Sequence, residues 1–388
     1  MATDEALSSM KIIHIDVWRI AMPFDARRRN MPDAMSGDAY NAASPALAKM
    51  ESLLLKLTAD SGLAGWGEAF GHLCNPASYA ALAGSVGRYF LGAELDGSPG
   101  GIASLMTGAQ QAFHGFGSTG PMMYALSAAD TALWDLSAKQ AGQPLYRLLG
   151  AQRSTIEAYA SLPSYDNEPS EVAWQAARAA KAGFRKIKLH ETSPRAIRAA
   201  REALPDDVEL MVDVNCPWNR EQAANIVEEL ADARLAWLEE PVWPPDDLEG
   251  LAGLRGKGIR IAAGENASGL RGLQAHLRPP SVDIVQPSVA KIGGISAMLE
   301  AIGQARDAGV LAVPHCFYYG AGMCATAQIV ATLGADVLLE LPFLEWQENL
   351  HPLLPVRPVV SLPDTPGLGF GPDDRTLEVY KVDHAVLC

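Results

Sequence analysis

The sequence predicts a (β/α)₈ barrel joined to an α+β capping domain, and two observations lead to this prediction. From residue 153 onward, eight short apolar segments alternate with helical ones, which is typical of a parallel α/β barrel. The chain has 388 residues, and a barrel needs roughly 250, so a second, smaller domain is expected. An open doubly wound sheet is the alternative, but no GxGxxG turn follows the first strand.

Residues 1–150 are expected to form the capping domain. Three apolar runs predict strands at 12–18, 52–58 and 62–68, and residues 74–150 have helical spacing that stops at Gly150. A polar, irregular stretch at 23–45 is too long for an ordinary connection. We interpret it as a lid, together with a shorter loop at 70–75; a plain surface excursion is the alternative.

Residues 151–349 are expected to form the barrel, and residues 350–388 a C-terminal segment that packs back on the capping domain. This segment is rich in proline and ends in a strand-like piece, Leu377–Val382. The expected barrel strands lie at 156–160, 184–189, 209–212, 236–238, 259–262, 282–285, 310–313 and 337–341.

Composition narrows the class of protein. The net charge of −14 argues against nucleic acid or an anionic membrane as partner. No apolar run approaches the roughly 20 residues of a membrane span, and the first residues do not resemble a signal peptide. Five scattered cysteines without a CxxC pair indicate free thiols and a cytoplasmic location. Such an acidic protein must supply positive charge locally if its substrate is an anion.

Polar residues follow the expected strands at a regular interval. Successive members are 23 to 27 residues apart, which is one βα unit each time, and the set is Lys188, Asp213, Glu239, Glu265, Ser288, His315 and Glu340. In a (β/α)₈ barrel the carboxyl ends of the strands meet at the mouth, where active sites lie. These residues are therefore expected to form a ring around one point.

Three consecutive members of this ring are acids: Asp213, Glu239 and Glu265. Carboxylates that converge in a small space repel one another, and protonation or a bound cation relieves the repulsion. Oxygen ligands suit a hard, octahedral ion with room for substrate oxygens. The pattern predicts a Mg²⁺ site, although a single acid at a strand end is usually a helix cap or a surface charge.

The run Lys186-Ile187-Lys188 supplies positive charge. Residues two apart on a strand face the same way, so both ammonium groups are expected to point into the barrel beside the metal, followed by His190. Burial and mutual repulsion should lower the pKa of each lysine. We interpret Lys188 as the catalytic base and Lys186 as its electrostatic partner.

These pieces together resemble the enolase superfamily, and within it the mandelate racemase/muconate lactonizing group. The matching motifs are Lys186-Ile187-Lys188, Val212-Asp213-Val214-Asn215, Trp237-Leu238-Glu239-Glu240-Pro241, Gly264-Glu265-Asn266 and Lys291-Ile292-Gly293-Gly294. The resemblance implies Mg²⁺ on the three acids and proton abstraction next to a substrate carboxylate, through an enediolate. It also implies a homo-oligomer, between dimer and octamer.

The resemblance further implies that loops of the N-terminal domain, near Phe24–Tyr40 and Gly71–Asn75, close over the substrate. The expected substrate contacts are Tyr40, His72, His190, Asn215, Ser288, Glu340 and Glu345. The family has an acid on the eighth strand that contacts a substrate carboxylate. The spacing favours Glu340, whereas the local sequence Leu344-Glu345-Trp346 favours Glu345; we prefer Glu345 and keep Glu340 as the alternative.

One departure from the family pattern favours dehydration over racemisation. Racemase-type members pair an Asp on the sixth strand with a His on the seventh; here His315 is present, but Ser288 replaces the Asp. A serine can orient the imidazole but supplies no charge, so His315 should be a weaker base that still serves as an acid. Lys188 as base and His315 as acid suit dehydration of an acid sugar or similar hydroxy acid.

Other functions remain open. Racemisation, epimerisation or lactone cycloisomerisation could use the same Lys/His pair. A barrel that binds a sugar acid without turnover is more remote, because it would have no need to keep every metal ligand and the base. A glycoside hydrolase also uses paired carboxylates, but needs neither the KxK run nor a third acid.

Overall fold

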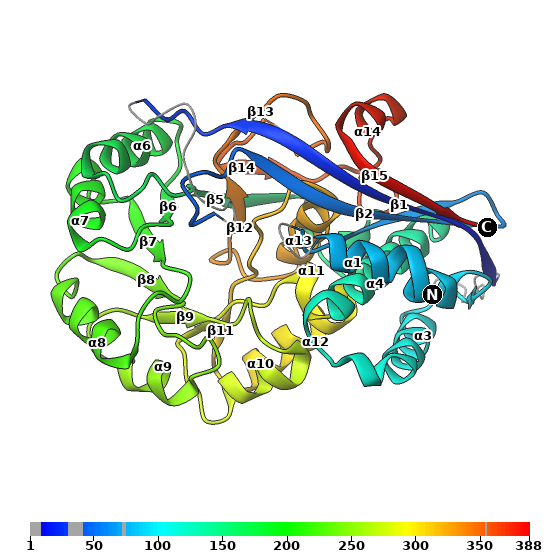
Figure 1. Ribbon diagram of the computed structural model, residues 1–388, viewed down its shortest axis with the longest axis horizontal. Helices are drawn as coiled ribbons and strands as arrows, with labels where there is room; N and C mark the ends of the chain where they lie inside the picture. The colour runs from blue at the N-terminus through cyan, green and yellow to red at the C-terminus, as the bar shows by residue number, and fades with distance from the viewer. Residues whose placement is uncertain (1–8, 30–41, 72–74, 354) are drawn as a thin grey trace.

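The computed structural model describes residues 9–29, 42–71, 75–353 and 355–388, which form two sheets surrounded by helices (Figure 1). Tyr40 and His72, two of the expected substrate contacts, lie outside the described residues. Within the described ranges, no helix is long and apolar enough to cross a membrane.

The antiparallel sheet forms the capping domain. Its strands run in the order β13-β1-β2-β3, and β4 and β15 also pair with β1. The strands are β1 (Met10–Asp25), β2 (Lys49–Ala59), β3 (Ala64–Ala69), β4 (Glu94–Leu95), β13 (Glu345–Trp346) and β15 (Lys381–Leu387). Its helical part consists of α1 (Asn75–Ala81), η2 (Leu82–Val86), α2 (Gly87–Phe90), α3 (Pro99–Ala112), η3 (His114–Phe116), α4 (Gly120–Gln140) and α5 (Leu145–Leu148).

The second sheet is parallel and curls into the barrel, with hydrogen-bonded neighbours from β12 through β5 to β11. Its strands are β5 (Thr155–Ser161), β6 (Lys186–Leu189), β7 (Glu209–Asp213), β8 (Leu235–Glu239), β9 (Ile261–Ala263), β10 (Ile284–Val285), β11 (Leu311–Ala312) and β12 (Leu339–Pro342); β14 (Val359–Ser361) pairs antiparallel with β5. The eight parallel strands confirm the predicted fold class, and each predicted strand end lies within two residues of the observed one.

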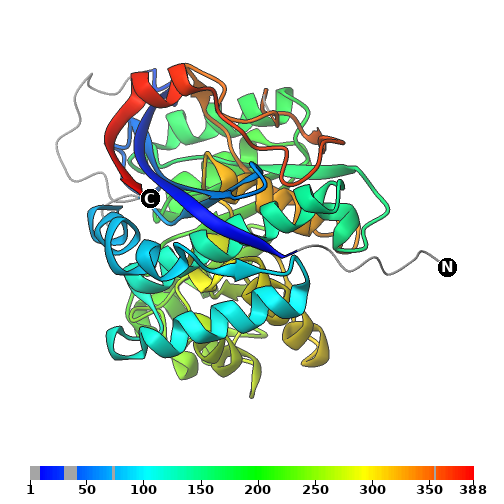
Figure 2. The same ribbon diagram turned by 90° about the vertical axis from the view of Figure 1, so that its right-hand side faces the viewer.

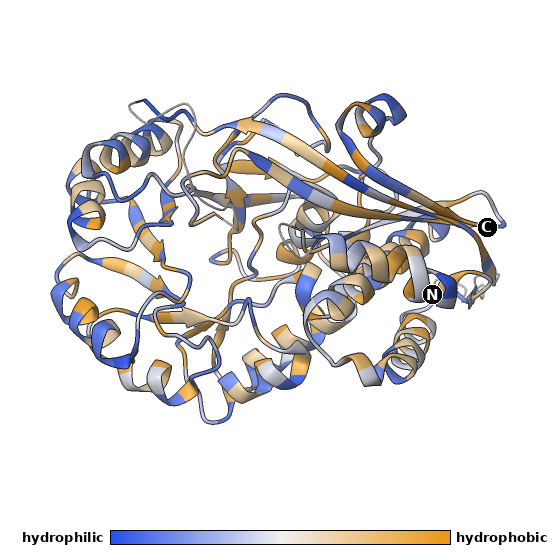
Figure 3. Cartoon of the chain, viewed as in Figure 1, coloured by the Kyte–Doolittle hydropathy of each residue, from blue (hydrophilic) through white to orange (hydrophobic). Residues whose placement is uncertain are grey.

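Helices between the strands cover the outside of the barrel. They are α6 (Pro169–Lys181), α7 (Pro194–Ala203), α8 (Arg220–Glu229), α9 (Leu248–Leu254), α10 (Gly269–Leu277), α11 (Val289–Ile292), α12 (Gly294–Asp307) and α13 (Ala321–Val330), and α14 (Asp374–Tyr380) lies near the C-terminus. In Figure 3 the helices α6 and α8 carry both hydrophilic and hydrophobic residues, while β8 and β9 are largely apolar. An apolar stripe facing the sheet, with polar residues outward, is the pattern expected of such helices.

The C-terminal segment returns to the capping sheet, where β15 pairs with β1 from Ile15↔Leu387 to Ile20↔Lys381. Figure 2 shows the two strands side by side. The predicted strand at Leu377–Val382 is wrong in its first part, because residues up to Tyr380 belong to α14. Asp373 caps this helix by accepting a hydrogen bond from the Thr376 amide at 2.8 Å. Such a cap starts a helix despite the alternating apolar residues that follow.

Helix α4 holds the two domains together. Its residues from Ala125 to Ala138 are buried, because it packs on β3 of the capping sheet and on α11 and α12 of the barrel. Asp130 accepts a hydrogen bond from the Ser296 amide at 2.9 Å. Gly294, with φ +81°, passes so close to Asp130 that a Cβ there would lie 2.4 Å from its carboxylate. The second glycine of the Lys291–Gly294 motif is therefore required by packing.

Asp135 on the same helix joins three segments. Its carboxylate accepts hydrogen bonds from the Trp66 amide at 2.8 Å, the Leu368 amide at 2.7 Å and the Lys139 ammonium at 2.7 Å. These partners belong to β3, to the C-terminal segment and to α4 itself. Each buried backbone N–H would lose its acceptor if the carboxylate were removed.

We predict that Asp135→Ala lowers the free energy of unfolding by roughly 2–4 kcal/mol, because two buried amides lose their acceptor and the Lys139 ammonium keeps only the Ala64 carbonyl. Urea denaturation followed by circular dichroism measures the change. Asp232→Ala, which removes an aspartate whose side chain is 77% exposed, serves as the matched control and should leave the midpoint nearly unchanged. Equal midpoints for the two variants would contradict the linking role of Asp135.

Candidate active site and metal centre

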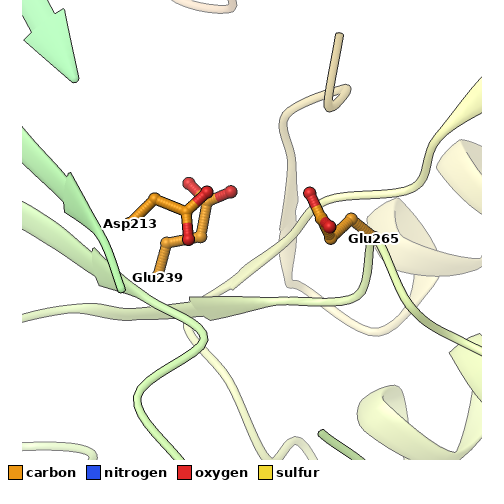
Figure 4. Close-up of side chains that lie close together, drawn as sticks. All are labelled: Asp213, Glu239 and Glu265. Atoms are coloured by element: carbon orange, nitrogen blue, oxygen red, sulfur yellow. The ribbon is translucent and has the colours of Figure 1, made fainter. Parts of the chain in front are cut away.

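Three carboxylates meet at the mouth of the barrel. Asp213, Glu239 and Glu265 each offer an oxygen, and these oxygens lie within 4.8 Å of one another. Figure 4 shows Asp213 and Glu239 side by side, with Glu265 facing them across a small space. All three are buried: the exposed fractions are 1%, 0% and 8%.

The strand ends place these acids. Asp213 and Glu239 are the last residues of β7 and β8, and they are direct partners in the register of the two strands. Glu265 follows the end of β9 by two residues. After β7 the backbone turns sharply, with φ +51° at Asn215, so that the Asn215 amide donates to Asp213 at 3.0 Å. Parallel strands therefore deliver residues distant in sequence to one point.

Lys188 lies beneath the acids and is fully buried. Its ammonium group is 3.2 Å from Asp213, 3.0 Å from Glu239 and 2.8 Å from Glu340. Burial disfavours its charged form, but the three carboxylates outweigh burial and raise the pKa of Lys188 well above its usual value. The expected lowering of its pKa is thus wrong, because acids surround this lysine instead of a second lysine.

Glu265 has its own partners. His315 approaches it at 2.7 Å through Nε2, and the Lys291 ammonium approaches it at 3.0 Å. Burial opposes ionisation, yet His315 and Lys291 hold the pKa of Glu265 well below its usual range. Lys291 also donates to Asn266 at 3.1 Å and stands 4.1 Å from the ring centre of Phe70. Glu265 is consequently held as an anion.

The charges around the mouth do not balance without a further cation. Four buried carboxylates, Asp213, Glu239, Glu265 and Glu340, face two buried ammonium groups, Lys188 and Lys291. A fifth buried acid nearby, Glu240, accepts from Asn266, and burial raises its pKa to about 8. Burial and the neighbouring Asp213 raise the pKa of Glu239 well above its usual value, which is the strain expected of crowded acids. One divalent cation supplies the missing charge, and the all-oxygen donor set suits Mg²⁺.

His190 directly follows the last residue of β6, one side-chain layer above Lys188 and nearer the mouth of the barrel. Its Nε2 is 3.3 Å from Asp213, and its Nδ1 is 2.5 Å from the backbone oxygen of Leu162. A carbonyl oxygen can only accept, so Nδ1 carries a proton. The other nitrogen, Nε2, therefore faces the acids from the Asp213 side.

His315 faces the acids from the opposite side, next to Glu265. Ser288, which replaces the family's aspartate, forms an isolated backbone bridge with His315. The Ser288 hydroxyl, however, bonds to the hydroxyl of Tyr318. Tyr318 in turn lies 3.4 Å from Nδ1 of His315. A tyrosine thus stands between the two residues that the sequence placed together.

Lys186 is not part of this cluster. Its ammonium group is 3.4 Å from Glu209, and it lines a cavity of about 120 Å³ near the amino ends of the strands, with Arg260 and Asp336. The expectation that both lysines lie beside the metal is wrong. Residues two apart share a face but are separated by roughly 7 Å along the strand, so Lys186 lies one layer too low.

The structure also separates the two candidates on the eighth strand. Glu340 is fully buried against Lys188 and accepts from the Cys316 amide at 2.7 Å. Glu345 is 45% exposed and pairs with Arg27 and Arg178 away from the acids. Of the two, Glu340 lies in the cluster.

Several residues of the site had no individual role in the sequence prediction. Gln286 and Trp237 donate to Glu239 at 2.8 and 3.1 Å, while Lys291 and Tyr318 contact Glu265 and His315 as described. Lys291 was visible inside a matching motif. Trp237 precedes Glu239 by two residues, which puts both on one face of β8. Tyr318 lies in a loop, where spacing gives no signal.

The fold and site together define a (β/α)₈-barrel enzyme with a buried three-carboxylate Mg²⁺ centre. Residues 171–376 match the family model for the enolase C-terminal domain-like fold, and residues 31–150 match that for the N-terminal domain of mandelate racemase/muconate lactonizing enzyme. The chain belongs to the enolase superfamily, in its mandelate racemase/muconate lactonizing enzyme group.

Relatives of known activity include cycloisomerases, dehydratases and an epimerase. D-galactarolactone cycloisomerase of Agrobacterium fabrum is 30% identical over 93% of this chain and 99% of its own length. L-talarate/galactarate dehydratase of Salmonella typhimurium is 32% identical over 76% of this chain and 75% of its own. A structure of the latter with Mg and L-lyxarohydroxamate has a TM-score of 0.81 at 26% identity, covering 100% of this chain and 97% of that one.

We predict that Glu239→Gln lowers the affinity for Mg²⁺ by at least roughly 10- to 100-fold, the loss typical even of residues that only support metal ligands. Isothermal titration calorimetry measures it. Glu249→Gln, at a glutamate whose side chain is 86% exposed, should bind Mg²⁺ like the unmodified protein. Undiminished affinity in Glu239→Gln would remove this residue from the metal centre.

Proposed function

We propose that the protein dehydrates an acid sugar, abstracting the proton next to the carboxylate and expelling the hydroxyl group on the neighbouring carbon. The observation that supports this best is the placement of His190 and His315 on opposite sides of the metal acids. Elimination needs one base for the proton and one acid for the leaving hydroxyl. Two imidazoles across the mouth can divide these tasks.

His190 is the better candidate for the base. Lys188, the base predicted from the sequence, is surrounded by three carboxylates that hold its proton, and it lies one layer below the mouth. His190 has its Nδ1 proton on the Leu162 carbonyl, which leaves Nε2 as its basic nitrogen toward the site. Once Asp213 is engaged by a cation, Nε2 is free to accept the substrate's proton.

Lys188 keeps a catalytic role in this proposal. When bound, Mg²⁺ supplies positive charge that stabilises the enediolate formed as the α-proton leaves. Lys188 adds a fixed ammonium group beside Asp213 and Glu239, and Glu340 holds that group in place at 2.8 Å. Preorganised charge of this kind is among the largest contributions to enzymatic rates.

His315 gives its Nε2 proton to the departing hydroxyl, which leaves as water. The C–O bond breaks with its electron pair on oxygen, and the resulting enol rearranges to a 2-keto-3-deoxy acid. Ser288 in place of an aspartate fits this role, because no carboxylate on the sixth strand holds the imidazolium proton.

Lactone cycloisomerisation is the second candidate, since a relative that aligns over 93% of the chain is a D-galactarolactone cycloisomerase. It would begin with the same abstraction of the α-proton, and the ring oxygen of the lactone would leave in place of a free hydroxyl group. A screen of purified protein with Mg²⁺ against acid sugars and aldonic or aldaric lactones separates the two. Formation of 2-keto acid from open-chain sugar acids supports dehydration, whereas turnover of lactones alone would overturn it.

Removal of the metal by a chelator distinguishes a metal-dependent lyase from a glycoside hydrolase. We predict that excess EDTA abolishes turnover and that added Mg²⁺ restores it, because the negative charge of the intermediate then loses its stabilisation. Activity that survives EDTA would contradict a metal-dependent elimination and point to a hydrolase that uses carboxylates alone.

We predict that His190→Asn lowers the rate at which the substrate α-proton exchanges with D₂O by a factor of roughly 10² or more. Lys188→Arg keeps the positive charge and should retain measurable exchange. Proton NMR of the substrate follows the exchange, and calorimetry verifies that Mg²⁺ still binds. Unchanged exchange in His190→Asn, with loss in Lys188→Arg, would return the base role to Lys188.

We predict that His315→Asn lowers dehydration by roughly 10²–10⁴-fold while α-proton exchange continues, since the base lies on the other side of the metal. The same NMR samples report exchange and product together. Loss of both processes to the same extent would mean that the two histidines do not divide the tasks in this way.

A further inference from the structure

Tyr318 stands between His315 and Ser288, the residue that the sequence resemblance aligns with the family's paired acid. It lies in the loop after β11, is 3% exposed, and its ring meets that of His315 edge-on, with centroids 5.6 Å apart and an angle of 86°. Its hydroxyl lies 3.4 Å from Nδ1 of His315 and also bonds to the Ser288 hydroxyl. The two hydroxyls form a continuous chain that ends on the imidazole.

The capping domain holds this tyrosine in position. Phe70, at the end of β3, packs edge-on against the Tyr318 ring at 6.3 Å, and the Phe70 amide donates to the Ala290 carbonyl at 3.2 Å. On the other side, a Cβ at Gly322 would stand 3.4 Å from the Tyr318 ring. With its ring confined between the two domains, Tyr318 has its hydroxyl aimed at one nitrogen of His315.

We propose that Tyr318, anchored by Ser288, is the positioning residue that orients His315 as the proton donor. The imidazolium Nδ1–H donates to the Tyr318 oxygen, and the tyrosine O–H donates to Ser288. When Nε2–H is given to the leaving hydroxyl, the Nδ1–H bond remains in place, so the ring keeps its orientation through the transfer. This inference rests on the dehydration proposed above.

A hydroxyl pair differs from a carboxylate in a way that matters for this task. Both accept the Nδ1 proton and align the ring, but a carboxylate adds a negative charge beside the imidazolium and stabilises it. The Ser288–Tyr318 pair is neutral, so it aligns His315 at Nδ1 without adding a second carboxylate to the one that Glu265 places at Nε2. The replacement of aspartate by serine is therefore coupled to a tyrosine thirty residues further on.

The kinetic test uses Tyr318→Phe, which keeps the ring and removes the hydroxyl. We predict that kcat for dehydration falls roughly 10- to 100-fold, less than on loss of the acid itself, while KM stays within about twofold and α-proton exchange continues at the unmodified rate. Tyr319→Phe is the matched control, because the neighbouring hydroxyl bonds to the Glu348 carbonyl and not to His315; both kcat and exchange should be unchanged.

Variants at Ser288 test whether the hydrogen bonds from Ser288 through Tyr318 to His315 affect the reaction, or whether Tyr318 acts only by packing. Ser288→Ala should lower kcat in the same direction as Tyr318→Phe, Ser288→Thr should restore most of it, and the Ser288→Ala/Tyr318→Phe double variant should be no slower than Tyr318→Phe. Such non-additivity is expected of groups that act through one contact. Additive losses, wild-type kinetics in Tyr318→Phe, or an equal fall of exchange and dehydration would each overturn the proposal.

A spectroscopic measurement makes the result independent of the substrate. In the Mg²⁺-loaded protein labelled with ¹⁵N-histidine, and with His315→Asn used for assignment, the Nδ1 signal of His315 should shift in Tyr318→Phe and stay in Tyr319→Phe. An unshifted signal in Tyr318→Phe would overturn the contact. If no acid sugar is turned over, the proposed function fails, and this signal alone decides whether Tyr318 positions His315.

Discussion

The concentration of buried negative charge at the barrel mouth is the constraint on which the rest of the site depends. Asp213, Glu239, Glu265 and Glu340 are brought together by strand geometry and removed from water, which makes each charge costly. The protein offsets part of this cost with two ammonium groups, that of Lys188 among three of the acids and that of Lys291 on Glu265. The deficit that remains matches a divalent cation, so the centre is incomplete without its metal.

This arrangement also explains why so many contacts converge on the acids. Gln286 and Trp237 donate to Glu239, and the Asn215 amide donates to Asp213. Hydrogen bonds to the outer lone pairs orient each carboxylate, which leaves the inner oxygens facing the common space. Although the chain has a net charge of −14, two of its ammonium groups, those of Lys188 and Lys291, are buried at this one point.

The fold and the three metal-binding acids could be predicted from the sequence because both follow a regular spacing of residues. A repeat of about 25 residues locates successive strand ends, and acids at three successive ends can hardly be explained by capping alone. Position along a strand is harder to predict. Lys186 and Lys188 have the same orientation, yet only Lys188 reaches the acids, since the depth of a residue in the barrel depends on where the strand begins. The helix at Asp374–Tyr380 likewise followed from a cap that an alternating pattern concealed.

The periodicity of the sequence could not predict contacts between loops. Tyr318 stands between Ser288 and His315 because the loop after β11 folds back under Phe70 of the capping domain, and no local pattern records that path. The consequence is chemical as well as geometric. A site with one imidazole held on a backbone carbonyl and the other on a neutral hydroxyl chain treats its two faces differently. Reversible transfer between two equal bases requires similar faces, whereas elimination requires one face that takes a proton and another that gives one. The asymmetry of the partners, more than the identity of either histidine, supports the dehydration that we propose.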